Sequence, residues 1–240
     1  MTQMSLPDFV KAGNQGVNPE LYEIENRALD REGSVWAALQ QLAPWAQRTL
    51  VDLGCGSGFW LPRYVKEAAR VIGIEPDPDL LPAALARTAG ADVMAGSAEH
   101  LPLADASVDV VHARFAYFFP TPNNDCSAGL SKVLRVLKPG GSLIVIDNDH
   151  HQGEFAGLLA QSPAAAASQG TDAYIRQWWA QQGATRTEVM SSWTFDTHED
   201  LAAVLTMEFP PEIAAPWLAS NPKGTSLTYG YFLHHVRRDP

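Results

Sequence analysis

The residues best suited to chemistry lie in one short segment, a glycine turn that follows an apolar strand. Residues 49–58 read Thr-Leu-Val-Asp-Leu-Gly-Cys-Gly-Ser-Gly, and a second apolar run over residues 70–75 ends in Glu75. Glycines let a backbone turn approach a ligand closely, because no Cβ stands in the way. An acid at the tip of the neighbouring strand can accept the two hydroxyl groups of a ribose. The pair therefore predicts a nucleoside-binding crevice.

The segment around this crevice alternates short apolar runs with helical patterns. The apolar runs cover residues 50–53, 71–74, 92–94, 108–112 and 143–146. Such βαβα alternation predicts a parallel sheet covered by helices on both faces. With right-handed crossovers the sheet is doubly wound, and its ligand crevice lies at the carboxyl ends of the strands. The predicted fold class is α/β.

Helical patterns also precede and follow this segment. Residues 19–42 are expected to be largely helical, with Asn18 as N-cap, Pro19 in the first turn and an interruption at Gly33-Ser34. Residues 171–182 predict a helix that Gly183 ends.

Further elements are expected toward the C-terminus. Thr197 opens a capping box and a helix, and residues 185–195 and 225–236 predict two strands. Ala164–Ala167, with flanking Ser and Gly, predicts a linker.

Composition limits the class of protein. The chain has 240 residues, which suits one large domain or one domain with a cap. Acidic residues outnumber basic ones by 27 to 17, a formal net charge of −10, which disfavours binding to a phosphate backbone. Two cysteines cannot build a disulfide framework or a four-thiolate metal site, and Cys55 is expected to pack rather than react. No signal peptide or membrane span is visible, so a cytoplasmic location is expected, and no metal site is predicted.

Four blocks in this order resemble class I S-adenosylmethionine-dependent methyltransferases of the small-molecule, methyltransferase type 11-like kind. They are VDLGCGSG at 51–58, VIGIEPD at 71–77, GSAEHLPLADASVDVV at 96–111 and RVLKPGGSLIVID at 135–147. The resemblance covers roughly residues 49–147. It implies a Rossmann-like seven-stranded sheet, mostly parallel with an antiparallel last strand, plus a helical cap.

The same resemblance implies how the chain is divided. Residues 1–48 are expected to form an N-terminal helical cap. Residues 49–240 are expected to form the S-adenosylmethionine-binding methyltransferase domain, with a cover over the acceptor site around 150–220.

The resemblance also implies which residues hold S-adenosylmethionine, which leaves the reaction as S-adenosylhomocysteine. The glycine turn would contact the methionine part, Glu75 the ribose, and the third block the adenine, where Ser97 replaces the usual acid. A hydroxyl can still accept a hydrogen bond from the adenine amine, although more weakly than a carboxylate. Tyr22 is a further candidate, because an N-terminal helix often closes over the cofactor in related enzymes. The predicted cofactor contacts are Tyr22, Asp52, Gly54, Cys55, Gly56, Glu75, Pro76, Ser97, Ala98, Glu99 and Ala113.

A nicotinamide-dependent oxidoreductase is the weaker alternative. The dinucleotide pattern G-x-G-x-x-G serves a pyrophosphate, and its third glycine would fall at position 59, where this chain has Phe59. S-adenosylmethionine has no pyrophosphate and does not need that glycine.

Methyl transfer is an in-line displacement, so alignment of nucleophile, methyl and sulfur does most of the work. A base is needed only when the acceptor has a proton to lose. His150 or His151, after the fifth predicted strand, could be that base, because imidazole titrates near neutral pH; a pair of surface histidines is the alternative. Tyr117 is expected to line the methyl site. Arg114 could bind an anionic acceptor, but pairing with a nearby acid is favoured.

One further histidine and two missing motifs bear on the reaction. His112 is expected to be a core residue as much as a catalytic one. The Asp/Asn-Pro-Pro-Tyr/Phe motif of exocyclic-amine methyltransferases and the Pro-Cys nucleophile of cytosine methyltransferases are both missing. The resemblance implies a small acceptor with an O, N or C nucleophile, and the tryptophans Trp178, Trp179, Trp193 and Trp217, some of which could line its pocket, suggest that it is partly apolar. Two alternatives stay open: a non-catalytic protein that binds the cofactor, and a methyltransferase acting on RNA or protein. The sequence does not indicate an oligomeric state.

Overall fold

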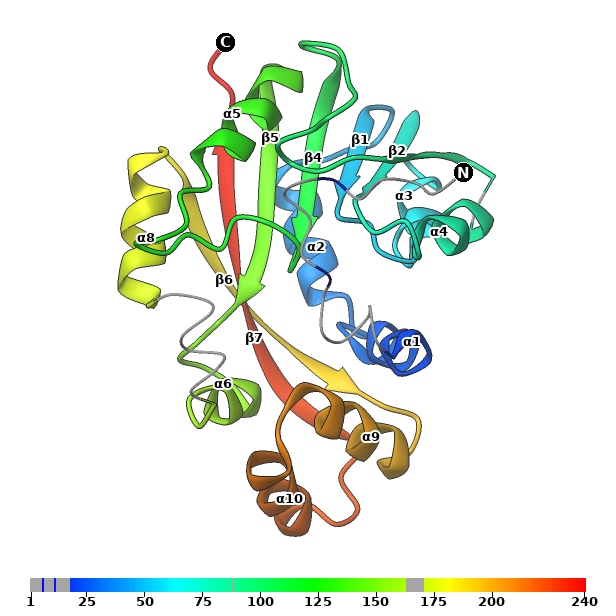
Figure 1. The fold of residues 1–240 in the computed structure, drawn as a ribbon, viewed down its shortest axis with the longest axis vertical. Coiled ribbons are helices and arrows are strands. Elements are labelled where there is room, and N and C mark those ends of the chain that lie inside the picture. The colour runs from blue at the N-terminus through cyan, green and yellow to red at the C-terminus, as the bar shows by residue number, and fades with distance from the viewer. Residues whose placement is uncertain (1–5, 7–10, 12–17, 88, 163–170) are drawn as a thin grey trace.

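A seven-stranded sheet forms the centre of the described structure (Figure 1). The computed structural model describes residues 6, 11, 18–87, 89–162 and 171–240. The strand order is β3-β2-β1-β4-β5-β7-β6. All neighbouring strands run parallel except β7, which is antiparallel to both β5 and β6. The α/β fold with an antiparallel last strand is thus confirmed. The strands are β1 (Thr49–Leu53), β2 (Arg70–Glu75), β3 (Ala91–Ala95), β4 (Val108–Arg114), β5 (Leu137–Asn148), β6 (Thr185–Thr194) and β7 (Ser226–Arg237).

Helices connect and cover these strands, as expected where parallel neighbours need crossovers. β6 and β7 run on past the other strands toward α9 and α10, which lie at the far end of the molecule in Figure 1. The helices are α1 (Pro19–Ala28), α2 (Ser34–Leu42), α3 (Leu61–Tyr64), α4 (Leu81–Arg87), α5 (Ser127–Val136), α6 (Glu154–Leu159), α8 (Asp172–Gln181), α9 (His198–Glu208) and α10 (Pro211–Ser220).

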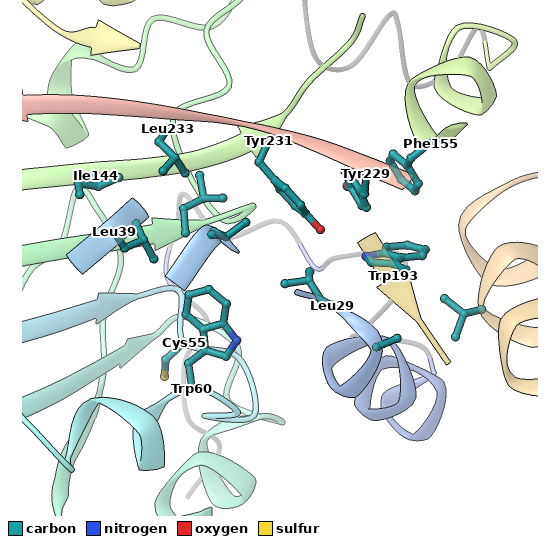
Figure 2. Close-up of a cluster of buried hydrophobic side chains, with 14 of the residues drawn as sticks. Leu29, Leu39, Cys55, Trp60, Ile144, Phe155, Trp193, Tyr229, Tyr231 and Leu233 are labelled. Carbon is teal, nitrogen blue, oxygen red and sulfur yellow. The ribbon is translucent and has the colours of Figure 1, made fainter. Parts of the chain in front are cut away.

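Alternation along the buried strands places a hydrophobic core on each face of the sheet. On β1, Leu50 belongs to one cluster and Val51 to the other. The first cluster packs α2, α6 and α9 against the sheet, and Figure 2 shows Leu39 of α2 together with Ile144 and Tyr231 from the strands. The second cluster packs α5 and α8 against the opposite face. Complete burial of one such aliphatic side chain contributes about 1.5–3 kcal/mol.

The N-terminal helical region differs from its prediction in where it breaks. α1 ends at Ala28 rather than continuing to Gly33, because Leu29 forms an isolated β-bridge with Trp193 of β6. Asn18 occupies the N-cap position without a side-chain capping bond. The break thus spans residues 29–33, and Gly33 is the N-cap of α2 with φ +79°.

Asp30, inside this break, holds α2 and β6 together. Its carboxylate accepts hydrogen bonds from the backbone N–H groups of Val35 and Trp36, both at 3.0 Å. The same carboxylate accepts from the Ser191 hydroxyl at 2.7 Å, and the Asp30 N–H donates to the Ser192 carbonyl at 3.1 Å. Orphan donors at the start of α2 are therefore satisfied from a neighbouring segment.

The predicted elements toward the C-terminus are present. Thr197 caps α9 by accepting from the Asp200 N–H at 3.0 Å, and Thr171 caps α8 in the same way at 3.3 Å. Gly183 follows α8 with φ +70°. The expected linker at 164–167 lies outside the described residues. None of the helices in the described ranges has the length and apolar character needed to cross a membrane.

Asp30→Ala is expected to destabilise the fold by about 2–4 kcal/mol. The substitution removes a helix cap and leaves buried N–H donors without partners. Urea unfolding followed by circular dichroism measures the change. Asp196→Ala is the matched control, because the Asp196 side chain is 66% exposed and its ion pair among the described residues is with Arg31 at the surface; that loss should be about 0–1 kcal/mol. Equal losses in the two variants would contradict the anchoring role of Asp30.

Candidate functional site

The glycine turn is fastened to the end of β2 by one buried carboxylate. Glu75 is 3% exposed, and its Oε2 accepts the Gly56 N–H at 2.6 Å while Oε1 accepts the Asp77 N–H at 2.8 Å. The N–H groups of Gly54 and Cys55 donate to the Ile74 carbonyl at 2.8 and 3.0 Å. These contacts bring Gly54, Cys55 and Gly56 together with Glu75, as the crevice predicted from the sequence requires.

The environment of Glu75 suits a ligand that donates hydrogen bonds. Burial raises the pKa of Glu75 to about 7, although the N–H groups of Asp77 and Gly56 favour its ionised form. A carboxylate offers about four lone-pair sites, and the two backbone donors use two of them. Capacity remains for the two hydroxyl groups of a ribose.

Gly54 permits a close approach between the turn and the loop after β4. Its φ is +73°, and a Cβ there would lie 2.3 Å from the Cβ of Ala116 and 3.2 Å from Cε2 of Tyr117. A larger residue would therefore clash and would be strained at this φ. The predicted methyl-site residue Tyr117 thus lies directly against the glycine turn.

A cavity of about 440 Å³ lies beside the glycine turn, between α1 and α4. Its walls include Tyr22, Ser57, Asp77 and Leu80. Tyr22 therefore lies beside the glycine turn, and burial raises the pKa of its hydroxyl.

One ion pair holds α1 in this place. The Glu23 carboxylate accepts hydrogen bonds from the Ser57 hydroxyl and from Nη2 of Arg87, the latter at 2.5 Å. Arg87 also donates to the Ser57 carbonyl at 3.2 Å. Sequence analysis missed Glu23 and Arg87, because no local pattern links two residues 64 positions apart.

Of the predicted adenine-side residues, which follow β3, Ser97 and Ala98 are buried and Glu99 is half-buried. Ser97 is 1% exposed, and its hydroxyl accepts the His100 N–H at 3.1 Å and lies 3.3 Å from Nδ1 of the same histidine. When the hydroxyl donates to that Nδ1, one of its lone pairs is left for a further donor. Ala98 and Glu99 lie against Gly129 of α5, since a Cβ on Gly129 would be 2.9 Å from both side chains. Pro76 is half-buried directly after Glu75. Ala113 is buried on β4, paired with Leu53 of β1.

Asp52 and Arg114 lie at the carboxyl ends of β1 and β4. Asp52 is 4% exposed, and burial raises its pKa to about 6 while the Arg114 charge lowers it. Arg114 donates from Nη1 to Oδ1 of Asn26 at 3.1 Å, and its guanidinium lies 4.6 Å from the ring centre of Trp60. Within the described part of the chain it makes no ion pair within 4 Å, so these residues show no partner for the favoured pairing with an acid. The reason is tertiary: α1 supplies an amide and α3 is preceded by an aromatic ring.

His112 is a core residue. Its Nδ1 lies 3.0 Å from the Tyr64 hydroxyl, its ring packs edge-on against Trp45, and burial lowers its pKa to about 3. The side chain is completely buried. The core alternative considered for this histidine is therefore confirmed.

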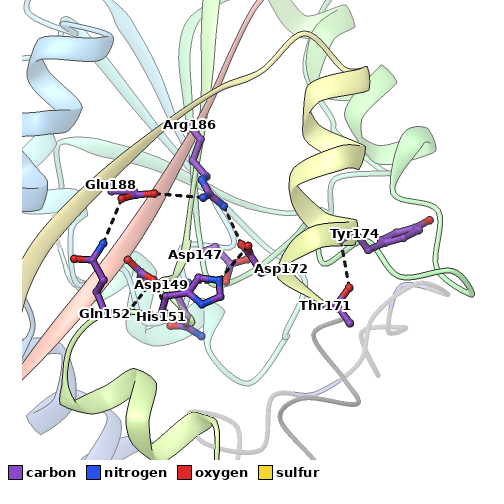
Figure 3. Close-up of polar contacts among 10 residues, drawn as sticks. Asp147, Asp149, His151, Gln152, Thr171, Asp172, Tyr174, Arg186 and Glu188 are labelled. Atoms are coloured by element: carbon purple, nitrogen blue, oxygen red, sulfur yellow. Dashed lines mark hydrogen bonds and ion pairs between the residues drawn. The ribbon is translucent and has the colours of Figure 1, made fainter.

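His150 and His151 follow β5 but have different surroundings, and Figure 3 shows those of His151. Nε2 of His151 lies 3.1 Å from Oδ2 of Asp172, the first residue of α8. Oδ1 of Asp172 accepts a hydrogen bond from Arg186 at 2.8 Å. The His151 side chain is 61% exposed. His150 is half-buried, its Nε2 has no hydrogen-bond partner among the described residues, and burial lowers its pKa. The backbone N–H of His151 donates to Asp149, and its side chain pairs with Asp172. Among the described residues, neither contact links His151 to the glycine turn or to Tyr117.

Comparisons of sequence place the central part of the chain in a known family. Residues 51–145 match the family model described as "Methyltransferase domain". An uncharacterized methyltransferase from Mycobacterium tuberculosis is 34% identical over 111 residues, 46% of this chain and 44% of that protein. One from Mycobacterium leprae is 38% identical over 129 residues, 52% of this chain and 45% of that protein. The chain thus spans less than half the length of these relatives.

Solved structures show the same fold over most of the chain. A SAM-dependent methyltransferase from Aquifex aeolicus aligns with a TM-score of 0.56 and 15% identity, covering 91% of this chain and 98% of the other. The complex between the Haloferax volcanii Trm112 methyltransferase activator and a methyltransferase contains a chain that aligns with a TM-score of 0.60 and 22% identity, covering 94% and 96%. Fold, glycine turn and family match agree: residues 51–145 match the methyltransferase domain family, and the described chain shares its fold with the solved SAM-dependent methyltransferase.

Proposed function

We propose that this protein transfers a methyl group from S-adenosylmethionine to a small-molecule acceptor. The observation that carries the proposal is the Glu75 carboxylate, which is buried, bonded to Gly56 of the glycine turn and still able to accept two hydroxyl groups. When bound, S-adenosylmethionine supplies a methyl group activated by a positively charged sulfur. The family match over residues 51–145 supports that donor.

Each predicted contact has a place in this proposal. Glu75 and Pro76 would hold the ribose, and Tyr22 would cover it from α1. Asp52, Gly54, Cys55, Gly56 and Ala113 would hold the methionine part. Ser97, Ala98 and Glu99 would flank the adenine.

Tyr117 and the two histidines have separate parts in the proposed transfer. Contact between the Tyr117 ring and Gly54 supports its role as a wall of the methyl site. His150 is the better candidate base of the two histidines, because its Nε2 is enclosed and unbonded among the described residues, whereas His151 is held by Asp172. A neutral imidazole can take the proton that the acceptor loses, and the lowered pKa of His150 keeps it neutral at pH 7.

The acceptor is proposed to be small and partly apolar. The protein is proposed to act in the cytoplasm. Residues 1–48 are proposed to form an N-terminal helical cap, and residues around 150–220 a cover over the acceptor site. The net charge of −10 supports a small molecule over a nucleic acid. An RNA or protein acceptor is the second candidate, favoured by the likeness to the structure solved with the Trm112 activator. A protein that binds the cofactor without transfer is the third.

Glu75→Gln is expected to weaken S-adenosylhomocysteine binding by about 1–3 kcal/mol, because a charged acceptor is lost. The ribose favours the ionised carboxylate, so wild-type affinity should be constant above about pH 8 and fall as pH drops below the pKa of about 7. Isothermal titration calorimetry between pH 5.5 and 8.5 measures both effects.

The pH dependence of binding that comes from Glu75 should be absent in Glu75→Gln, because an amide does not titrate between pH 5.5 and 8.5. Asp92→Asn, on the exposed edge of β3 and paired with Arg70, should keep wild-type affinity and pH dependence. Binding by Glu75→Gln that equals wild type would remove Glu75 from the ribose site.

Methyl transfer itself can be tested by release of S-adenosylhomocysteine across a library of phenols, amines and carboxylic acids. Turnover with at least one small molecule is expected. On that acceptor, His150→Ala should lower kcat about 100-fold or more, the usual contribution of general base catalysis, whereas His151→Ala should change it only slightly. Release only with RNA or protein present would favour the second candidate, and equal effects of the two variants would argue against the assignment to His150.

A further inference from the structure

Arg114 lies where the methionine part of the cofactor would meet the sheet. In the parallel pairing of β1 with β4, Asp52 is opposite His112 and Leu53 is opposite Ala113. Arg114 is therefore the next residue along β4, level with the glycine turn. Residues two apart on a strand share a face, so Arg114, His112 and Asp52 all lie on the same face of the sheet.

The guanidinium of Arg114 has more donors than its surroundings use. It carries five N–H groups and stays charged at any ordinary pH. One donor reaches Oδ1 of Asn26, and the flat face covers Trp60. Among the described residues no carboxylate lies within ion-pair distance. A half-buried cation in this state favours an anion that can accept two of its N–H groups at once.

The nearest acids do not serve as that anion. Glu25 of α1 is 9% exposed, and its Oε2 is buried without a hydrogen-bond partner. Burial and the neighbouring Glu208 raise its pKa well above the ordinary value, which favours the neutral form. Asp52 lies on the same face, and none of the described residues donates a hydrogen bond to its carboxylate.

The amino-acid end of S-adenosylmethionine carries an ammonium and a carboxylate on one carbon. We propose that Asp52 and Arg114 together bind this zwitterion, with Asp52 accepting from the ammonium and Arg114 donating to the carboxylate. This inference rests on the proposed cofactor, and it adds Arg114 to the residues that select it. It also gives a role to two charged side chains that lie at the ends of neighbouring strands and form no ion pair with each other within 4 Å.

Comparing two ligands tests the inference without knowledge of the acceptor. S-adenosylhomocysteine has the amino-acid end, whereas 5′-methylthioadenosine shares its adenine, ribose and thioether and lacks that end. Arg114→Met should weaken S-adenosylhomocysteine binding about 10- to 100-fold, as expected for a charge-assisted bidentate contact. Binding of 5′-methylthioadenosine should change less than about twofold, and Arg114→Lys should fall between wild type and Arg114→Met for the first ligand.

Arg63→Met is the matched control. Arg63 also lies over a tryptophan, with its guanidinium 3.8 Å from the ring centre of Trp36, so its loss removes a similar stacking contact. Both affinities should stay at the wild-type level in that variant. Calorimetry with the two ligands gives the ratio of affinities directly, and thermal unfolding checks that each variant is folded.

The outcomes separate this inference from the proposed function. If wild type binds both ligands and Arg114→Met leaves their affinity ratio unchanged, the role of Arg114 is wrong while the cofactor stands. Equal weakening for both ligands would make Arg114 a structural residue and would also overturn the inference. If wild type binds neither ligand, the proposed cofactor itself fails.

Discussion

The carboxylate of Glu75 is the contact on which the geometry of the crevice depends. It joins the end of β2 to the glycine turn after β1, beside the hydrogen bonds that Gly54 and Cys55 donate to the Ile74 carbonyl. Gly54, Gly56 and Gly58 all have positive φ, so the turn is held in a backbone conformation that few residues tolerate. The burial of an acid at this point is unfavourable by itself, and the two N–H donors offset part of that cost. The groups that hold the turn are thus the groups proposed to meet the ligand.

Helix α1 connects this crevice to the opposite end of the molecule. Its first turns are bonded to the glycine turn and α4 through Glu23, and its C-terminal end passes into the segment that Asp30 ties to α2 and β6. Its outer face packs against α9. A displacement of α9 or β6 would therefore reach the cavity at Tyr22 through one short helix. This arrangement gives the region after β5 a physical route to influence the cofactor crevice.

The sequence predicted the strands and the glycine turn well, because both depend on local patterns. Apolar runs mark strands buried on two faces, and Glu75 follows directly from its place at the end of one run. Thr197 as a cap was equally local. Local patterns did not reveal contacts between distant segments: the Leu29–Trp193 bridge ends α1 early, Asn26 and Trp60 lie beside Arg114, and Asp172 pairs with His151. Nothing within a few residues of these positions reports such partners.

The position of β7 within the sheet has a consequence for synthesis of the protein. β7 lies between β5 and β6, so the strand nearest the C-terminus is an interior strand and β6 is joined to the sheet only through it. During translation β6 leaves the ribosome with no strand to pair with until residues 226–237 follow. Trp193 and the other apolar residues of β6 therefore have no partner strand while more than thirty further residues are synthesised, and β6 can join the sheet only after β7 has emerged.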